Sequence, residues 1–176
     1  MEQVRRRLPL LLAAVLLVGA GVALTLVRWP GRPATPPAVR QQPVVAEYLL
    51  QGEGRQAVVR LEVAASPAAR ERGLMGRTRV PPGAGMVFLF PADTTAGFWM
   101  KDTMVPLSIA FVAADGRVVA VWEMTPCSAD PCQVYGPGGS SYRYAVELAA
   151  GAFPAAGVRE GSRVVPRAPE RLPLVT

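Results

Sequence analysis

An Asp-Gly pair between two apolar runs constrains the fold of this chain more than any other short stretch. Residues 107–113 and 117–124 flank Ala114-Asp115-Gly116, and Asp-Gly in such a position is the strongest local signal for a tight β-hairpin. Other short apolar runs, bounded by turn residues, lie at 44–50, 57–65, 85–90, 142–148 and 162–165. The pattern predicts roughly seven or eight strands in a mostly β domain of the α+β class, with a small, partly closed, barrel-like antiparallel sheet.

One or two short helices complete this prediction. Ser66 is a favourable N-cap, Pro67 suits the first helical position, and Gly73 is typical of a helix end. Residues 153–157 form a turn or a second short helix. We therefore expect helices to play a minor part beside the sheet.

The strands differ in how their two faces are covered. Residues 85–90 are apolar throughout, which predicts a central strand buried on both faces. Residues 59–63 alternate instead, with Arg60 and Glu62 on one face, as expected for a strand with one face in solvent.

The chain begins with a long apolar run. Residues 8–27 carry no charge and follow Arg5-Arg6-Arg7. As a helix, twenty residues rise roughly 30 Å, the thickness of a hydrocarbon core. Residues 1–28 are therefore predicted to be a transmembrane signal anchor, with a cleaved signal peptide as the alternative. Either interpretation places the rest of the chain outside the cytoplasm, as a single-pass membrane protein or, after cleavage, as a secreted one.

The remaining boundaries follow from composition. Residues 29–43 contain five prolines and are predicted to be a semi-rigid linker. Residues 44–166 hold all the strand signals and form the globular domain. Residues 167–176 lack any pattern and are predicted to be a loose tail.

Charge and histidine content exclude several functions. The net charge is +6, but residues 1–43 hold six arginines against one glutamate. The rest of the chain is almost neutral, so no nucleic-acid partner is expected. The sequence has no histidine, which removes Ser-His-Asp and Cys-His catalysis and histidine-ligated metals. We predict no metal, no cofactor and no catalytic residue.

The two cysteines, Cys127 and Cys132, lie in a long irregular loop at 125–141. Outside the cytoplasm they are expected to form a disulfide. A redox site is the alternative interpretation. Their spacing is not Cys-x-x-Cys, however, and no βαβ pattern precedes them.

Residues 98–107 hold the chain's only lysine, Lys101, beside Trp99. In an extended segment Phe98 and Met100 point into a core, while Trp99 and Lys101 share the other face, where a cation–π contact can form. This stretch is either an architectural strand end or a small ligand-binding site. The site would comprise Trp99, Lys101, Asp102 and Thr103, with Tyr135 and Tyr142 from the region of the long loop.

Several of these segments together resemble the domain of unknown function 192 family, a set of small, often exported prokaryotic domains. The pieces that carry the resemblance are RERGLM at 70–75, GMVFLF at 85–90, FWMKDT at 98–103 with Pro106-Leu107, VELAAG at 146–151, Gly157-Val158 and Gly161. The resemblance implies a compact, mostly β fold and no established activity. Asp102 and Ser108 depart from the family's usual Asn and Asp.

Three functions remain open. The first is an extracytoplasmic, membrane-anchored binding or interaction module, attached through residues 8–27, whose partner is an envelope sugar, a peptide or a protein. The second is a cell-envelope hydrolase or transferase that uses Lys101 as a base. That role requires Lys101 to be buried, because desolvation is what lowers the pKa of a lysine. The third is a purely structural envelope protein.

Overall fold

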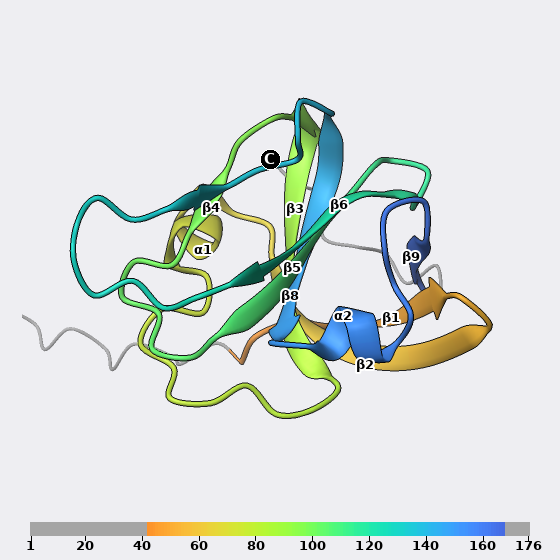
Figure 1. Cartoon of the computed structure of the whole chain (residues 1–176), viewed down its shortest axis with the longest axis horizontal. Helices are drawn as coiled ribbons and strands as arrows, with labels where there is room; N and C mark the ends of the chain where they lie inside the picture. The colour runs from red at the N-terminus through yellow and green to blue at the C-terminus, as the bar shows by residue number, and fades with distance from the viewer. Residues whose placement is uncertain (1–41, 168–176) are drawn as a thin grey trace, which may run out of the picture. The chain divides into compact units, whose positions relative to one another are not determined.

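The predicted hairpin is present at one edge of the sheet in the computed structural model, which describes residues 42–167 (Figure 1). Strands β5 (Leu107–Val112) and β6 (Val118–Met124) are antiparallel and joined across Asp115 and Gly116. The Asp115 Oδ1 accepts a 2.9 Å hydrogen bond from the Arg117 amide, and Gly116 has a φ of 88°. A side chain at Gly116 would also meet Val165 Cγ1 at 2.6 Å, so the turn needs glycine for both reasons.

Seven strands form one sheet in the order β6-β5-β8-β3-β2-β1-β9. The other strands of this sheet are β1 (Val45–Gly52), β2 (Arg55–Ala64), β3 (Ala84–Thr94), β8 (Tyr142–Ala149) and β9 (Arg163–Pro166). All neighbours are antiparallel except β2 and β3, which are parallel. The prediction of an antiparallel sheet was wrong at this pair. The chain leaves β2 through helix α1 (Pro67–Arg72) and a loop, a connection long enough to return it to the same end of the sheet.

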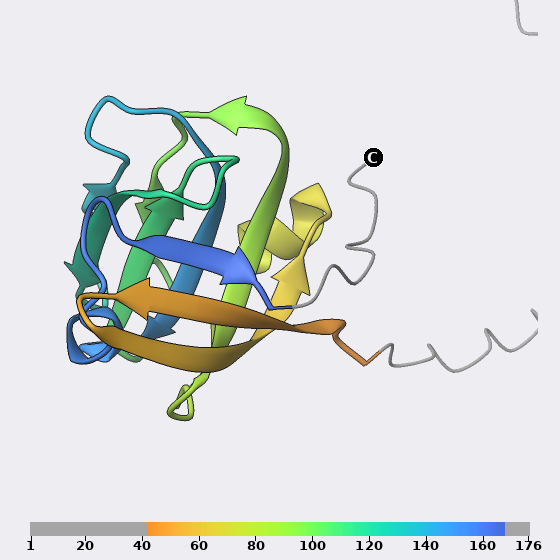
Figure 2. The same ribbon diagram turned by 90° about the vertical axis from the view of Figure 1, so that its right-hand side faces the viewer.

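The sheet curls into a half-barrel, so that its two outer strands meet at one end (Figure 2). Three backbone hydrogen bonds connect the starts of β6 and β9: Val118 N to Ser162 O at 2.8 Å, Gly161 N to Val118 O at 2.9 Å, and Val164 N to Gly116 O at 2.9 Å. The mostly β fold and the curled sheet thus confirm the coarse architecture expected from the sequence.

Two hydrophobic cores lie on opposite faces of the central strands. Tyr144, Val146 and Leu148 of β8 belong to the first core, together with Phe153 of helix α2 (Ala152–Ala155). Ala145 of the same strand belongs to the second core. Figure 1 shows α1 and β4 (Phe98–Trp99) on one side of the central strands β3, β5 and β8. On the other side it shows α2 together with β1, β2 and β9, the part of the same sheet that curls round. The central strands are therefore covered on both faces.

The helix signals and the strand end at Phe98–Trp99 are confirmed, and one short strand, at Val134–Tyr135, appears where an irregular loop was expected. The Ser66 hydroxyl accepts from the Ala69 amide at 3.2 Å, Pro67 begins α1, and Gly73 ends it with a φ of 47°. Strand β4 pairs with β7 (Val134–Tyr135) as a separate two-stranded sheet. Tertiary packing stabilises this pair, because two residues a strand are too few to form one alone.

The predicted disulfide is present, with a distance of 2.07 Å between the sulfurs of Cys127 and Cys132. The predicted signal anchor at 1–28, almost all of the linker at 29–43 and the tail beyond 167 lie outside the described residues. Within residues 42–167, no helix has the length and apolar character needed to span a bilayer.

Candidate functional site

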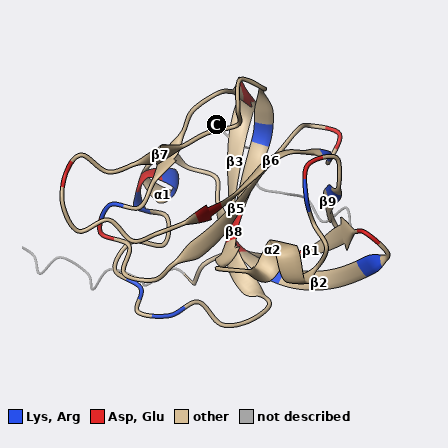
Figure 3. Cartoon of the chain, in the orientation of Figure 1, with Lys and Arg blue, Asp and Glu red and all other residues tan. Residues whose placement is uncertain are grey.

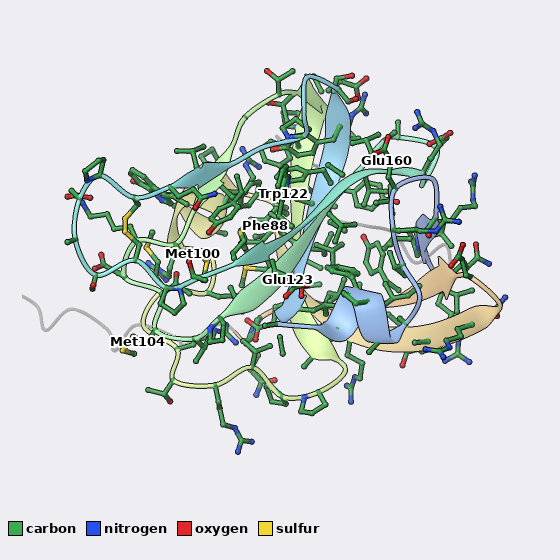
Figure 4. The ribbon with its side chains drawn as sticks, viewed as in Figure 1. Phe88, Met100, Met104, Trp122, Glu123 and Glu160 are labelled. Atoms are coloured by element: carbon green, nitrogen blue, oxygen red, sulfur yellow. A yellow bond between two sulfur atoms is a disulfide. The ribbon has the colours of Figure 1, made fainter. Side chains whose placement is uncertain are left out.

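A cavity of about 280 Å³ lies between helix α1 and strand β4, above the second hydrophobic core. We call it the α1–β4 pocket. Phe88 on β3, labelled in Figure 4, is part of its wall. The lining residues are Arg70, Glu71, Arg72, Gly73, Leu74, Met75, Phe88, Phe90, Ala96, Gly97, Phe98, Trp99, Thr103 and Glu147. The pocket therefore has an aromatic wall and several charged groups around it.

Glu147 is the buried ionisable group of this pocket, with only 4% of its surface exposed. No hydrogen bond or ion pair to its carboxylate occurs within residues 42–167, although every fully enclosed side-chain polar atom there has a hydrogen-bond partner. The carboxyl oxygens are therefore not fully enclosed, and Glu147 is one of the residues that line the cavity. Burial raises the pKa of Glu147 from 4.5 to about 8, because desolvation disfavours the charged form.

The position of Glu147 follows from the alternation of β8. Tyr144, Val146 and Leu148 point into the core inside the curled sheet, so Ala145 and Glu147 point to the opposite face. Strand β8 lies between β3 and β5, and the layer that carries α1 covers that face. A glutamate in this register is consequently buried.

Trp99 stands at the rim of the pocket, with 51% of its surface exposed. Met100, the next residue, is 1% exposed and packs in the second core. Lys101 returns to the outer face, where its Nζ lies 5.8 Å from the centroid of the Trp99 ring. This confirms the predicted alternation. The Lys101 ammonium pairs with Asp130 at 3.2 Å and does not line the pocket.

Asp102 and Thr103 have different places. Asp102 is exposed and adopts a φ of 54°, a conformation that Asn and Asp tolerate better than other non-glycine residues. Asp is therefore a suitable residue at this position, as the Asn implied by the resemblance would be. Thr103 is 6% exposed, lines the pocket, and donates its hydroxyl to the Lys101 carbonyl at 3.3 Å.

The two predicted tyrosines are buried outside the pocket. Tyr135 lines a separate cavity beside the disulfide, and its hydroxyl accepts a 3.2 Å hydrogen bond from the Thr125 amide. Tyr142 donates to the Ala96 carbonyl at 2.8 Å, and burial raises its pKa. Of the predicted site residues, the structure thus brings only Trp99 and Thr103 together at one pocket. The prediction that all six bind a ligand stays a prediction.

The second departure from the family also has a structural explanation. Ser108 is fully buried and donates its hydroxyl to Glu123 Oε1 at 2.5 Å. It also accepts from the Gly151 amide at 2.8 Å, and Glu123 Oε2 accepts from the same amide at 2.9 Å. Glu123, labelled in Figure 4, therefore supplies a carboxylate at this place from the neighbouring strand.

Other features of the described region suggest a site less strongly. A hollow of about 550 Å³ lies beside Trp122 and Glu160 (Figure 4), but its ionisable side chains are exposed. Positive and negative side chains are interspersed over residues 42–167 (Figure 3). No three His, Cys, Asp or Glu side chains in this range gather closely enough to hold a metal ion.

Glu147 was missed as a site residue by the sequence reasoning. One signal was available, because it is a lone acidic residue among apolar neighbours in a predicted strand and lies in the VELAAG segment. The sequence did not reveal that both faces of this strand are covered.

The described domain resembles a known family and two solved structures. The family model DUF192, described as "Uncharacterized ACR, COG1430", matches residues 49–166. A solved structure from Sinorhizobium meliloti, titled a putative transcription regulator, is 28% identical, with a TM-score of 0.66 over 73% of this chain and 98% of its own. A protein of unknown function from Novosphingobium aromaticivorans is 26% identical, with a TM-score of 0.63 over 71% and 93%. No curated protein matches the chain.

Proposed function

The chain belongs to the DUF192 family, and we propose that it acts there as a binding module that takes a small ligand, or a side chain of a partner, into the α1–β4 pocket. One observation carries the proposal: the unpartnered carboxyl of Glu147 at the pocket. A buried carboxyl without a partner reduces stability. The loss of stability is explained if the Glu147 carboxyl binds a ligand, because ionisable groups with strongly shifted pKa values are concentrated at functional sites.

The walls of the pocket support binding. Aromatic side chains and a few polar groups are the usual lining of ligand sites. Phe88, Phe90 and Phe98 supply apolar surface, and the exposed Trp99 ring adds a flat contact at the rim. An exposed tryptophan beside a cavity is typical of surfaces that bind sugars, peptides or amines.

Binding without turnover agrees better with the contacts than catalysis does. The hydrolase or transferase hypothesis required a buried Lys101, but 42% of that side chain is exposed and its ammonium is paired with Asp130. Thr103 is the one hydroxyl side chain lining the described pocket, and it donates to a backbone carbonyl. We therefore assign no nucleophile or base.

We further propose that the domain is tethered to the outer face of the cell membrane. The support is the uncharged run at 8–27, the proline-rich segment after it, and the disulfide, which is typical of oxidising compartments. Membrane fractionation and protease accessibility of intact cells test this. Recovery of the full chain in the cytosolic fraction, inaccessible to protease, would contradict it.

The nearly neutral domain favours this role over nucleic-acid binding. Residues 44–176 carry almost equal numbers of basic and acidic side chains, so they lack the charge excess that phosphate contacts require. We therefore do not extend the transcription-regulator description of the Sinorhizobium protein to this chain.

A ligand screen on residues 42–176 tests the pocket. The domain should fold alone, because the matching region makes up 98% of the Sinorhizobium chain. Amines, sugars and short peptides are screened by thermal shift, and the affinity of each hit is measured by isothermal titration calorimetry, which does not depend on a tryptophan signal. We expect a hit to lose binding in Trp99→Ala but not in Trp122→Ala, since Trp122 is also exposed, at 44%, and lies away from the pocket.

The screen also distinguishes the structural alternative. If the domain only stabilises an envelope assembly, no compound will raise the melting temperature, or the hits will bind equally well to both tryptophan variants. Either result would refute the pocket as the binding site.

A further inference from the structure

We propose that the occupant of the α1–β4 pocket carries a protonated amine on a short apolar stem, as a lysine side chain does, and that Glu147 is its counter-ion. This inference rests on the binding function proposed above and adds the chemical class of the ligand. The ammonium would enter past Trp99, place its stem against the phenylalanine rings, and pair with the carboxylate at the buried end.

The charges around the pocket leave Glu147 available. Arg70 is the basic residue of α1 that turns inward, but its Nη1 donates to the carbonyls of Ala65 and Leu89 at 2.5 and 2.9 Å. Lys101 is held by Asp130. No cation within residues 42–167 pairs with the Glu147 carboxylate, so a ligand cation can take that place.

The aromatic wall already binds cations from the chain itself. The Arg70 guanidinium lies 5.1 Å from the centroid of the Phe90 ring, and the Lys101 ammonium lies 5.8 Å from that of Trp99. Aromatic rings attract cations through their quadrupole, more strongly where water is excluded. A carboxylate in a pocket that aromatic rings also line therefore favours an ammonium over a neutral or anionic group.

The volume agrees with a small occupant. At about 280 Å³, the cavity is slightly smaller than the usual range for ligand pockets, which begins at about 300 Å³. It suits one extended side chain or one small amine. A larger ligand would place most of its surface outside.

The alternative to a protonated amine is a neutral ligand, and an experiment must distinguish the two. A protonated Glu147 can donate a hydrogen bond to a carbonyl, whereas an ammonium requires the ionised form. The charged groups that face Glu147 across the pocket are Arg70, Glu71 and Arg72 from α1; β3 and β4 contribute apolar side chains. The pKa of the Glu147 carboxyl is about 8, so binding of an ammonium below that pH should release the carboxyl proton. The affinity for the amine should therefore increase about tenfold for each unit by which the pH rises, as long as the pH stays well below 8.

The test uses Nα-acetyl-lysine methylamide and its norleucine counterpart, which keeps most of the apolar stem without the ammonium. Binding to residues 42–176 is measured by NMR titration. We expect the lysine compound to bind at least tenfold more tightly than the norleucine compound at pH 8, and to weaken about tenfold at pH 6.5. Butylamine is titrated as well, to decide whether the amine belongs to a partner protein or to a small molecule. Tighter binding of the acetyl-lysine methylamide than of butylamine indicates a lysine of a partner chain. Equal binding of the two compounds indicates a small-molecule amine.

Two variants complete the experiment. Glu147→Gln keeps the shape and the hydrogen-bonding groups but not the charge, and should reduce lysine binding at least tenfold. Glu160→Gln removes an exposed carboxylate that lies outside the pocket and should change binding less than twofold.

Equal binding of lysine and norleucine compounds, or full binding by Glu147→Gln, would overturn the ammonium while leaving the pocket as a binding site. The same conclusion follows if no amine binds but another compound from the screen does, and its binding is lost in Trp99→Ala. Failure of every compound in the thermal-shift screen refutes the binding function itself.

Discussion

The free energy of unfolding should fall as the pH rises through the neutral range, and Glu147 should be the cause. Its pKa is about 8 in the folded domain against 4.5 for the free side chain. Between these values the folded state binds more protons than the unfolded state, so stability decreases with pH. The contribution is fully present below about pH 4.5 and is lost as the pH passes through about 8.

The magnitude follows from the shift. Each pKa unit corresponds to about 1.36 kcal/mol, so between about pH 5.5 and pH 7.5 the domain should lose about 3 kcal/mol. For a domain of this size that is roughly 10 °C in melting temperature. The absence of histidine helps here, because no side chain with an ordinary pKa in this range competes with Glu147.

Urea denaturation of residues 42–176 across this pH range measures the slope, and Glu147→Gln is the matched variant. The amide cannot ionise, so its stability curve should be nearly flat and should exceed that of the wild type at pH 8. NMR of the glutamate carboxyl carbons gives the pKa directly. A wild-type curve that is flat within about 0.5 kcal/mol, or a variant with the same slope, would refute the assignment.

Two further predictions concern Asp102 and the disulfide, which lie outside the pocket. Asp102→Ala should cost about 1 kcal/mol because of the left-handed backbone at φ 54°, whereas Asp102→Asn should be nearly neutral; equal losses in urea denaturation would contradict this explanation. Cys127→Ser should lower stability by about 2 kcal/mol, since the disulfide closes a loop with a sequence separation of 5. A reductant should lower the wild-type melting temperature similarly and leave that of the variant unchanged.

Local signals predicted the local structure well. The Asp115-Gly116 turn, the caps of α1 and the alternation from Phe98 to Lys101 each depend on a few adjacent residues. Strand order depends instead on contacts between segments that are far apart in the sequence. The parallel pairing of β2 with β3 therefore could not be predicted from any single segment.

Strand β3 shows the same limit. It continues past the apolar run at 85–90, through Pro91 to Thr94. Its pairing with β8 is interrupted between Leu89 and Thr94, and this irregularity accommodates a proline that has no amide hydrogen to donate.

The candidate site depends on a difference that the sequence pattern conceals. Glu62 in β2 and Glu147 in β8 both alternate with apolar residues, and each pattern alone predicts a solvent-facing carboxylate. Glu62 has that environment: Arg77 forms two 2.7 Å hydrogen bonds with it, and its side chain is 24% exposed. Glu147 faces the covered side of a central strand and has no such arginine within residues 42–167. The two glutamates thus differ in what packs over them, and the missing counter-ion at Glu147 is the reason to seek it in a ligand.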